Sequence, residues 1–112
     1  MRVLLDENID RRFGRDIEAD FVVGVADHGR SGTKNGKLLS MAAAEFDILI
    51  AMDRGIEYQH DLSRVDLAVV VLRSVSSRLT DVLPLVPALN ALLPGMRLGQ
   101  LVELGTYDRS SR

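Results

Sequence analysis

Carboxylates follow two separate apolar runs of this sequence, at the point where each run ends. Asp6 and Glu7 come directly after residues 3–5, and Asp53 comes directly after the nearly continuous apolar run 46–52. Such short apolar runs are typical of buried β-strands. In an open α/β sheet, ligands bind at the carboxyl ends of the strands. The sequence therefore predicts that Asp6 and Asp53 lie at the same edge of a parallel sheet.

Carboxylates placed in this way suit a hard divalent cation. Mg²⁺ and Mn²⁺ take oxygen ligands, usually one or two carboxylates together with water and substrate phosphates. A metal held by Asp6 and Asp53 could activate water and neutralise the charge that develops on a phosphodiester. Glu7 could be a further ligand only if the chain turns after Asp6, because adjacent strand residues point to opposite faces. Helix capping by residues 6–8 and a turn at Asp53 before Gly55 are the structural explanations for the same residues.

Four polar residues could line the same site. Asn8 follows the first pair of acids, and Arg54, beside Asp53, could hold a substrate phosphate. Gln59 could line the mouth of the site, and Asn35 ends a glycine-rich stretch. Turn chemistry and a solvated surface position are the alternative explanations for these side chains.

The elements that must position these residues alternate between strands and helices. Further strands are expected at residues 20–26, 66–72 and 100–104. Three helices are expected. The first follows Asn8, which would cap it, and the second covers residues 35–45. The third begins after an N-cap at Thr80 and stops at Pro94. This alternation predicts an α/β fold, a three-layer α/β/α sandwich with a mostly parallel sheet of about five strands. We expect one domain over residues 1–105 and a flexible tail over residues 106–112.

Composition limits the class of protein. The chain has 112 residues, 46% of them hydrophobic and only 4% aromatic, so one mainly aliphatic core is expected. The absence of cysteine excludes disulfides, thiolate zinc sites and cysteine catalysis, and it suits a reducing cytoplasm. A net charge of −2 is unlike that of a globally basic nucleic-acid binder, but it is compatible with a metal-dependent nuclease. No signal peptide or membrane-spanning run is expected, so we expect a cytoplasmic protein.

Four motifs of the chain form a recognisable set. They are Leu4-Leu5-Asp6-Glu7-Asn8, Asp27-His28-Gly29 with Gly32, Asn35-Gly36-Lys37-Leu38-Leu39-Ser40-Met41-Ala42 and Asp47-Ile48-Leu49-Ile50-Ala51-Met52-Asp53. Together they resemble the PIN-like family of small bacterial and archaeal proteins, over nearly the whole chain to about Leu104. Many members of that family lie beside small antitoxin-like genes. The resemblance implies an α/β/α sandwich whose acidic cluster binds Mg²⁺ or Mn²⁺ and cuts RNA.

The resemblance also implies roles for individual residues. Asp6 and Asp53 match the family's metal-binding, catalytic carboxylates, and Glu7 matches the acid of the opening motif. Asn35 and Gly55 stand where many relatives have an acid. The implied function is a metal-dependent ribonuclease, the toxin component of a pair restrained by an antitoxin protein. Because this chain has fewer acids at these positions than many relatives, the alternative is a non-catalytic PIN-like interaction module.

A response-regulator receiver domain is a second class with acids after its first and third strands. Receivers need a lysine at the end of the last strand, and this chain has no lysine after Lys37.

A domain of this size could also form a homodimer through an apolar helix face such as that of residues 83–93.

Overall fold

The computed structural model of the protein describes residues 1–24, 35–52 and 66–105, with residues 35–39 described by their backbone alone. Strands, α-helices and 3-10 helices (η) follow one another in this part of the chain. Their bounds are β1 Arg2–Leu5, η1 Arg11–Asp16, β2 Phe21–Gly24, α1 Asn35–Glu45, β3 Ile48–Met52, β4 Ala68–Arg73, α3 Leu79–Val82, η2 Leu83–Leu85, α4 Val86–Leu92, η3 Leu93–Gly95 and β5 Leu101–Gly105.

The five strands form one sheet, in the order β2-β1-β3-β4-β5, and every pair of neighbours is parallel. This confirms the predicted parallel sheet. In the centre, Leu4 of β1 lies opposite Val23 of β2 on one side and opposite Leu49 of β3 on the other. The strand that precedes Asp6 and the strand that precedes Asp53 are therefore hydrogen-bonded neighbours.

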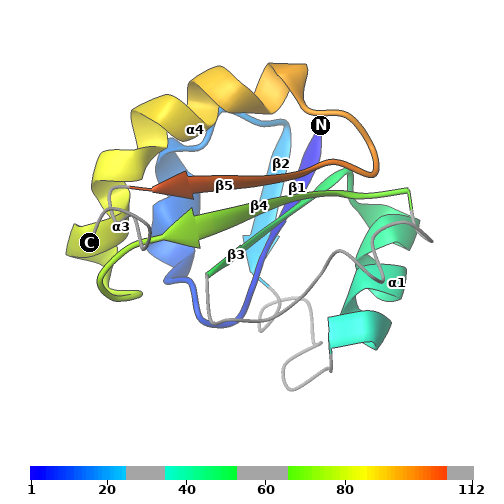
Figure 1. Ribbon diagram of the computed structural model, residues 1–112, viewed down its shortest axis with the longest axis horizontal. Coiled ribbons are helices and arrows are strands. Elements are labelled where there is room, and N and C mark those ends of the chain that lie inside the picture. Colours follow the sequence, from blue (N-terminus) through cyan, green and yellow to red (C-terminus); the bar gives the residue numbers. More distant parts are fainter. Residues whose placement is uncertain (25–34, 53–65, 106–112) are drawn as a thin grey trace.

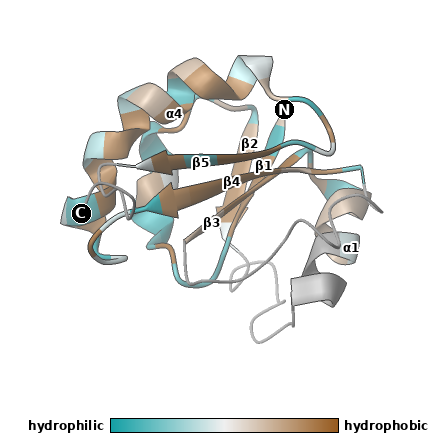
Figure 2. Cartoon of the chain, viewed as in Figure 1, coloured by the Kyte–Doolittle hydropathy of each residue, from teal (hydrophilic) through white to brown (hydrophobic). Residues whose placement is uncertain are grey.

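Helical segments cover both faces of the sheet, which confirms the predicted three-layer α/β/α arrangement (Figure 1). One face packs against η1 and the segments from α3 to η3, and the other packs against α1. Because both faces are covered, β3 is buried along its whole length and β4 along all but its last residue. Figure 2 shows these strands as continuous hydrophobic ribbons inside more hydrophilic helices.

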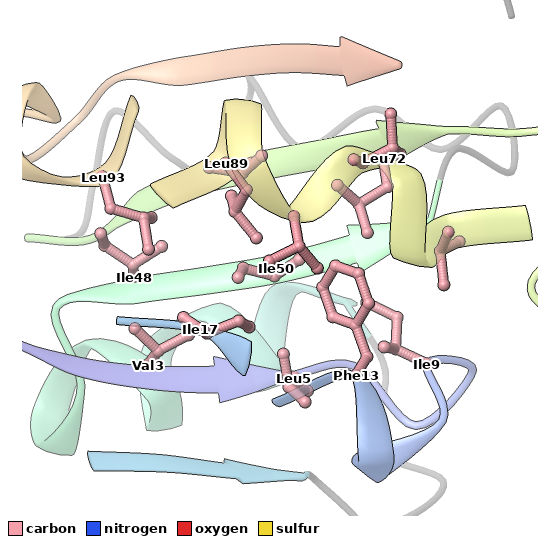
Figure 3. Packing of buried hydrophobic residues seen from close by; sticks show 14 of the residues in the cluster. Val3, Leu5, Ile9, Phe13, Ile17, Ile48, Ile50, Leu72, Leu89 and Leu93 are labelled. Atoms are coloured by element: carbon pink, nitrogen blue, oxygen red, sulfur yellow. The ribbon is translucent and has the colours of Figure 1, made fainter. Parts of the chain in front are cut away.

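The larger core cluster lies between the sheet and the layer that holds η1 and α4 (Figure 3). Phe13 of η1 is its largest fully buried side chain. Ile9 and Ile17, one on each side of η1, are also buried there. These three residues, spaced four positions apart in the sequence, therefore anchor the segment that follows Asp6 in the core.

Prolines divide the last helical region, which the sequence predicted as one helix. Pro84, Pro87 and Pro94 each lie in the first turn of a new segment, η2, α4 and η3 respectively. Proline has no N–H and tolerates only such first-turn positions, so the region changes between α and 3-10 geometry at each proline. The predicted N-cap at Thr80 is wrong, because Arg78 has the extended backbone of the cap and the helix begins at Leu79.

The apolar face of residues 83–93 packs against the chain's own sheet. Leu85, Val86, Leu89 and Leu93 are all buried in the larger core cluster. This face is therefore used within the chain, and a homodimer remains a prediction without an assigned surface. None of the helices in the described ranges has the length and apolar character needed to cross a bilayer.

Candidate functional site

The candidate site lies where the order of the strands reverses. From β1 the chain passes to β2 on one side of it, and from β2 it crosses to β3 on the other side. In open α/β sheets this reversal opens a crevice at the carboxyl ends of the two central strands, and ligands bind there. Asp6 is the first residue after β1 and therefore lies at this reversal of strand order. Its backbone N–H donates to the carbonyl of Ile50 at 2.9 Å, which extends the β1–β3 ladder by one residue.

Asp6 is the single charged residue that is buried among those whose burial is described, with 3% of its surface exposed. Removing a carboxylate from water is unfavourable unless protein donors replace the water. The Glu7 backbone N–H donates to Asp6 Oδ1 at 2.9 Å, and the Asn8 side-chain amide donates to Oδ2 at 3.4 Å. These bonds orient the carboxylate, and each oxygen of a carboxylate can accept from more than one partner.

A tight turn follows Asp6. The backbone N–H of Ile9 donates to the carbonyl of Asp6 at 3.0 Å, so the chain reverses over Glu7 and Asn8. A turn after Asp6 was the condition for Glu7 to lie on the same side as Asp6, and this turn is present. The Glu7 side chain is exposed, whereas Asn8 is half-buried and contacts the Asp6 carboxylate directly.

The prediction that Asn8 caps the following helix is wrong. That helix is η1, and its N-cap is Asp10, whose carboxylate accepts from the Arg12 backbone N–H at 2.9 Å. The reason is that residues 7–8 form the turn and Ile9 enters the core, so the helix begins later. The hydrogen bond from the Arg12 guanidinium, at 2.6 Å, lowers the pKa of Asp10 to about 2.

Several predicted site residues lie outside the described part of the chain. These are Asp53, Arg54 and Gln59, together with the side chain of Asn35, which begins α1. Met52, the residue before Asp53, ends β3 at the same sheet edge as Asp6. Within the described residues, no three side chains of His, Asp and Glu form a group that could hold a metal ion. The prediction that Asp53 shares a metal ion with Asp6 lies outside the described residues.

The sequence-based predictions overlooked Arg73, the last residue of β4. It is a charged residue at the end of a buried apolar strand, at the same sheet edge as Asp6. A charged residue in such a position is the sequence pattern from which Asp6 and Asp53 were predicted. Arg73 Nη1 lies 3.4 Å from Glu103 Oε1 of β5, and the Arg73 side chain is 18% exposed. A cation therefore stands near the carboxyl ends of the strands, next to β3 in the sheet order.

Comparisons of the chain with protein-family models, curated proteins and solved structures give no match.

The arrangement offers a defined set of chemical groups at one sheet edge. Asp6 supplies oriented carboxylate oxygens, and Asn8 supplies an amide beside them. Arg73 supplies a positive charge at the end of β4, which is separated from β1 by β3. Carboxylate oxygens are ligands for hard cations, and arginine is suited to phosphate oxygens.

Proposed function

We propose that the protein is a PIN-like, metal-dependent ribonuclease that hydrolyses phosphodiester bonds of RNA at the carboxyl ends of β1 and β3. The observation that carries the proposal is the buried, hydrogen-bonded carboxylate of Asp6 at the reversal of strand order. In this proposal the protein acts as a toxin, and an antitoxin protein restrains it.

The roles follow from the groups at this edge. Asp6 would bind Mg²⁺ or Mn²⁺ together with Asp53, and Glu7 would support them. When bound, the ion would lower the pKa of a water molecule and neutralise charge on the phosphate. The N–H of Glu7 and the amide of Asn8 hold the Asp6 carboxylate in one orientation, which limits the reorganisation needed to accept the ion.

Substitution of Asp6 tests the proposal directly. Asp6→Asn keeps the shape of the side chain and one acceptor oxygen but removes the charge. We expect Mn²⁺ affinity, measured by isothermal titration calorimetry, and cleavage of single-stranded RNA to fall at least about 100-fold, because even partners of metal ligands contribute 10–100-fold. Asp10→Asn is the matched control, because Asp10 lies four residues away and caps η1. Cleavage by pure Asp6→Asn protein at the wild-type rate would refute the proposal.

The alternative is a non-catalytic interaction module with the same fold. The same contacts of Asp6 would then serve only the turn at the end of β1. Wild-type protein that binds no Mn²⁺ at millimolar concentration and cleaves no RNA would favour this alternative.

The strand order supports one other candidate, a phosphoacceptor domain. The order 2-1-3-4-5 is also that of receiver domains and flavodoxins. Against it, β5 (Leu101–Gly105) contains no lysine that could contact a phosphoryl group. Incubation with a small phosphodonor followed by intact mass measurement distinguishes the two, because a receiver gains one phosphoryl group and a nuclease does not.

A further inference from the structure

A pocket lies beside the candidate site, between η1 and the strands β1 and β2. It is a pocket of about 320 Å³ lined by Leu5, Arg11, Gly14, Arg15, Val22, Val23 and Gly24. Its volume is at the lower end of the range for small-ligand pockets. Leu5, which lines it, directly precedes Asp6, so the pocket and the candidate metal site share the carboxyl end of β1.

The lining combines an apolar floor with a positively charged rim. Leu5, Val22 and Val23 supply aliphatic surface from two adjacent strands. Arg11 and Arg15 line the pocket from η1, and both residues are exposed. Among the described residues that line this pocket there is no Asp or Glu. Guanidinium groups bind phosphate oxygens in a bidentate manner, and an aliphatic floor suits a ribose or the face of a base.

Gly14 explains how the pocket forms. A Cβ atom built at this position would lie 2.9 Å from Val22 Cγ1 and 3.3 Å from Leu5 Cδ1. A Cβ atom here would therefore require the Val22 side chain to shift, so glycine suits the close approach of η1 to β1 and β2. The absence of a side chain at this point also keeps the apolar floor open between Arg11 and Arg15.

The neighbouring arginine on the same helix is engaged differently. Arg12 does not line the pocket, and its guanidinium binds the Asp10 carboxylate at 2.6 Å and 3.0 Å. Of the three arginines of η1, two therefore face the pocket and the third belongs to the helix cap.

We infer that this pocket binds one nucleotide of a single-stranded RNA, next to the nucleotide whose phosphate reaches Asp6. Arg11 and Arg15 bind the phosphodiester, and Leu5, Val22 and Val23 contact the sugar or base. The choice of RNA as the ligand rests on the proposed function, whereas the affinity for phosphate rests on the pocket itself.

Binding measured without metal separates this inference from catalysis. The probe is a fluorescent single-stranded RNA of about ten nucleotides, within the usual site size of such proteins, titrated in EDTA and followed by anisotropy. Arg11→Gln and Arg15→Gln should each weaken binding about 10-fold, as expected for the loss of a charged hydrogen bond. Arg12→Gln, the matched control with the same change of charge, should change the affinity less than about threefold.

The dependence on salt gives a second measure. Removing both pocket arginines should reduce the slope of log K against log salt by about 0.7 if they share one phosphate, and by about 1.4 if each binds its own. Circular dichroism should show that the variants keep the wild-type fold, because both side chains are exposed.

The outcomes are distinct. Loss of affinity in the two pocket variants but not in Arg12→Gln supports the pocket, even if Asp6→Asn still cleaves RNA and the proposed nuclease activity fails. An equal loss in all three variants, or no binding of RNA by wild-type protein, overturns the pocket even if RNA is cleaved. Displacement of the RNA by free nucleotide at lower concentration than by unlabelled RNA would overturn RNA as the ligand.

Discussion

Asp6 is held in a position that is unfavourable for a charge and favourable for a ligand. It is buried, and the donors to its oxygens include the Glu7 N–H at 2.9 Å and the Asn8 amide at 3.4 Å. The second distance is long for an N–H···O hydrogen bond, so the bond from the Glu7 N–H is the stronger of these two. A charged residue kept inside under these conditions is typical of functional sites, where proteins depart from the rules that maximise stability.

Two substitutions of Asp6 separate its structural from its chemical role. Asp6→Ala leaves the Glu7 N–H without its acceptor, and we expect the free energy of unfolding to fall by about 1–3 kcal/mol. Asp6→Asn keeps an acceptor oxygen, so its loss should be smaller than that of the alanine variant. Urea denaturation at pH 7 measures both. Equal losses in the two variants would mean that the negative charge itself stabilises the fold.

Asp10 makes stability depend on pH at the acid end. The hydrogen bond from Arg12 lowers the pKa of Asp10 from 3.8 to about 2 in the folded protein. A lowered pKa means that the stabilisation is fully present above pH 3.8 and is lost as the pH falls toward 2. Wild-type protein should therefore be more stable than Asp10→Asn at pH 6, and this difference should shrink between pH 4 and pH 2. Urea midpoints measured at several pH values test this, and a difference that does not change with pH would contradict it.

At the scale of elements, η1 is the segment that connects the candidate site to the core. Its cap, Asp10, lies on the solvent side, and Phe13 is buried completely against the sheet. A six-residue 3-10 helix has little stability of its own, so its position depends on such contacts. The turn after Asp6 and the pocket arginines therefore depend on the packing of Phe13.

Truncation of Phe13 should be severe. Phe13→Ala removes the largest fully buried side chain of the described residues, and we expect the free energy of unfolding to fall by about 3–5 kcal/mol. Val75→Ala, at a residue that is 77% exposed, should change it by less than about 0.5 kcal/mol. Chemical denaturation compares the two, and similar stabilities would show that η1 is not anchored through Phe13.

Glycines at two ends of elements should respond differently to alanine. A Cβ atom at Gly105, the last residue of β5, would lie 2.0 Å from the carbonyl oxygen of Arg73, so the end of β5 would have to move away from β4. At Gly95 nothing lies within 4 Å of the added atom. We expect Gly105→Ala to lower the melting temperature and Gly95→Ala to leave it unchanged or slightly higher, since alanine reduces the entropy of the unfolded chain. A melting temperature of Gly105→Ala equal to that of the wild type would contradict the close approach of the two strands.

At the scale of the whole molecule, the parallel sheet divides the core into two clusters. The larger one lies under η1, α3 and α4, and the smaller one lies under α1. The central strands β1, β3 and β4 contribute to both clusters, whereas the edge strands β2 and β5 are at most partly buried. The site edge is therefore built on the most deeply buried strands, which suits a rigid site.

Hydrogen exchange should reflect this order of burial. Amides of β3 and β4 should exchange only through global unfolding, whereas those of β2 and β5 should exchange through local opening with lower free energies. Native-state exchange followed by NMR at increasing denaturant measures these free energies. Protection of β2 equal to that of β3 would contradict an edge position for β2.

Local sequence determined the elements of this protein. Continuous apolar runs predicted β3 and β4 because strands covered on both faces need apolar side chains at every position. The bounds of α1 agree with the predicted residues 35–45, and the apolar residues before Asp6 correctly predicted a strand. These signals are local because they depend on the period of each element and on its own burial.

Only the tertiary structure decided how the elements meet. Strand order depends on pairings between distant segments, which the period of a sequence does not encode, and it is this order that puts β1 beside β3 and Asp6 at the reversal. The turn after Asp6 moved the helix cap from Asn8 to Asp10, because the core had to receive Ile9 first. The pocket of Arg11 and Arg15 likewise arises from the close packing of η1 on β2, a contact between segments that no local pattern specifies.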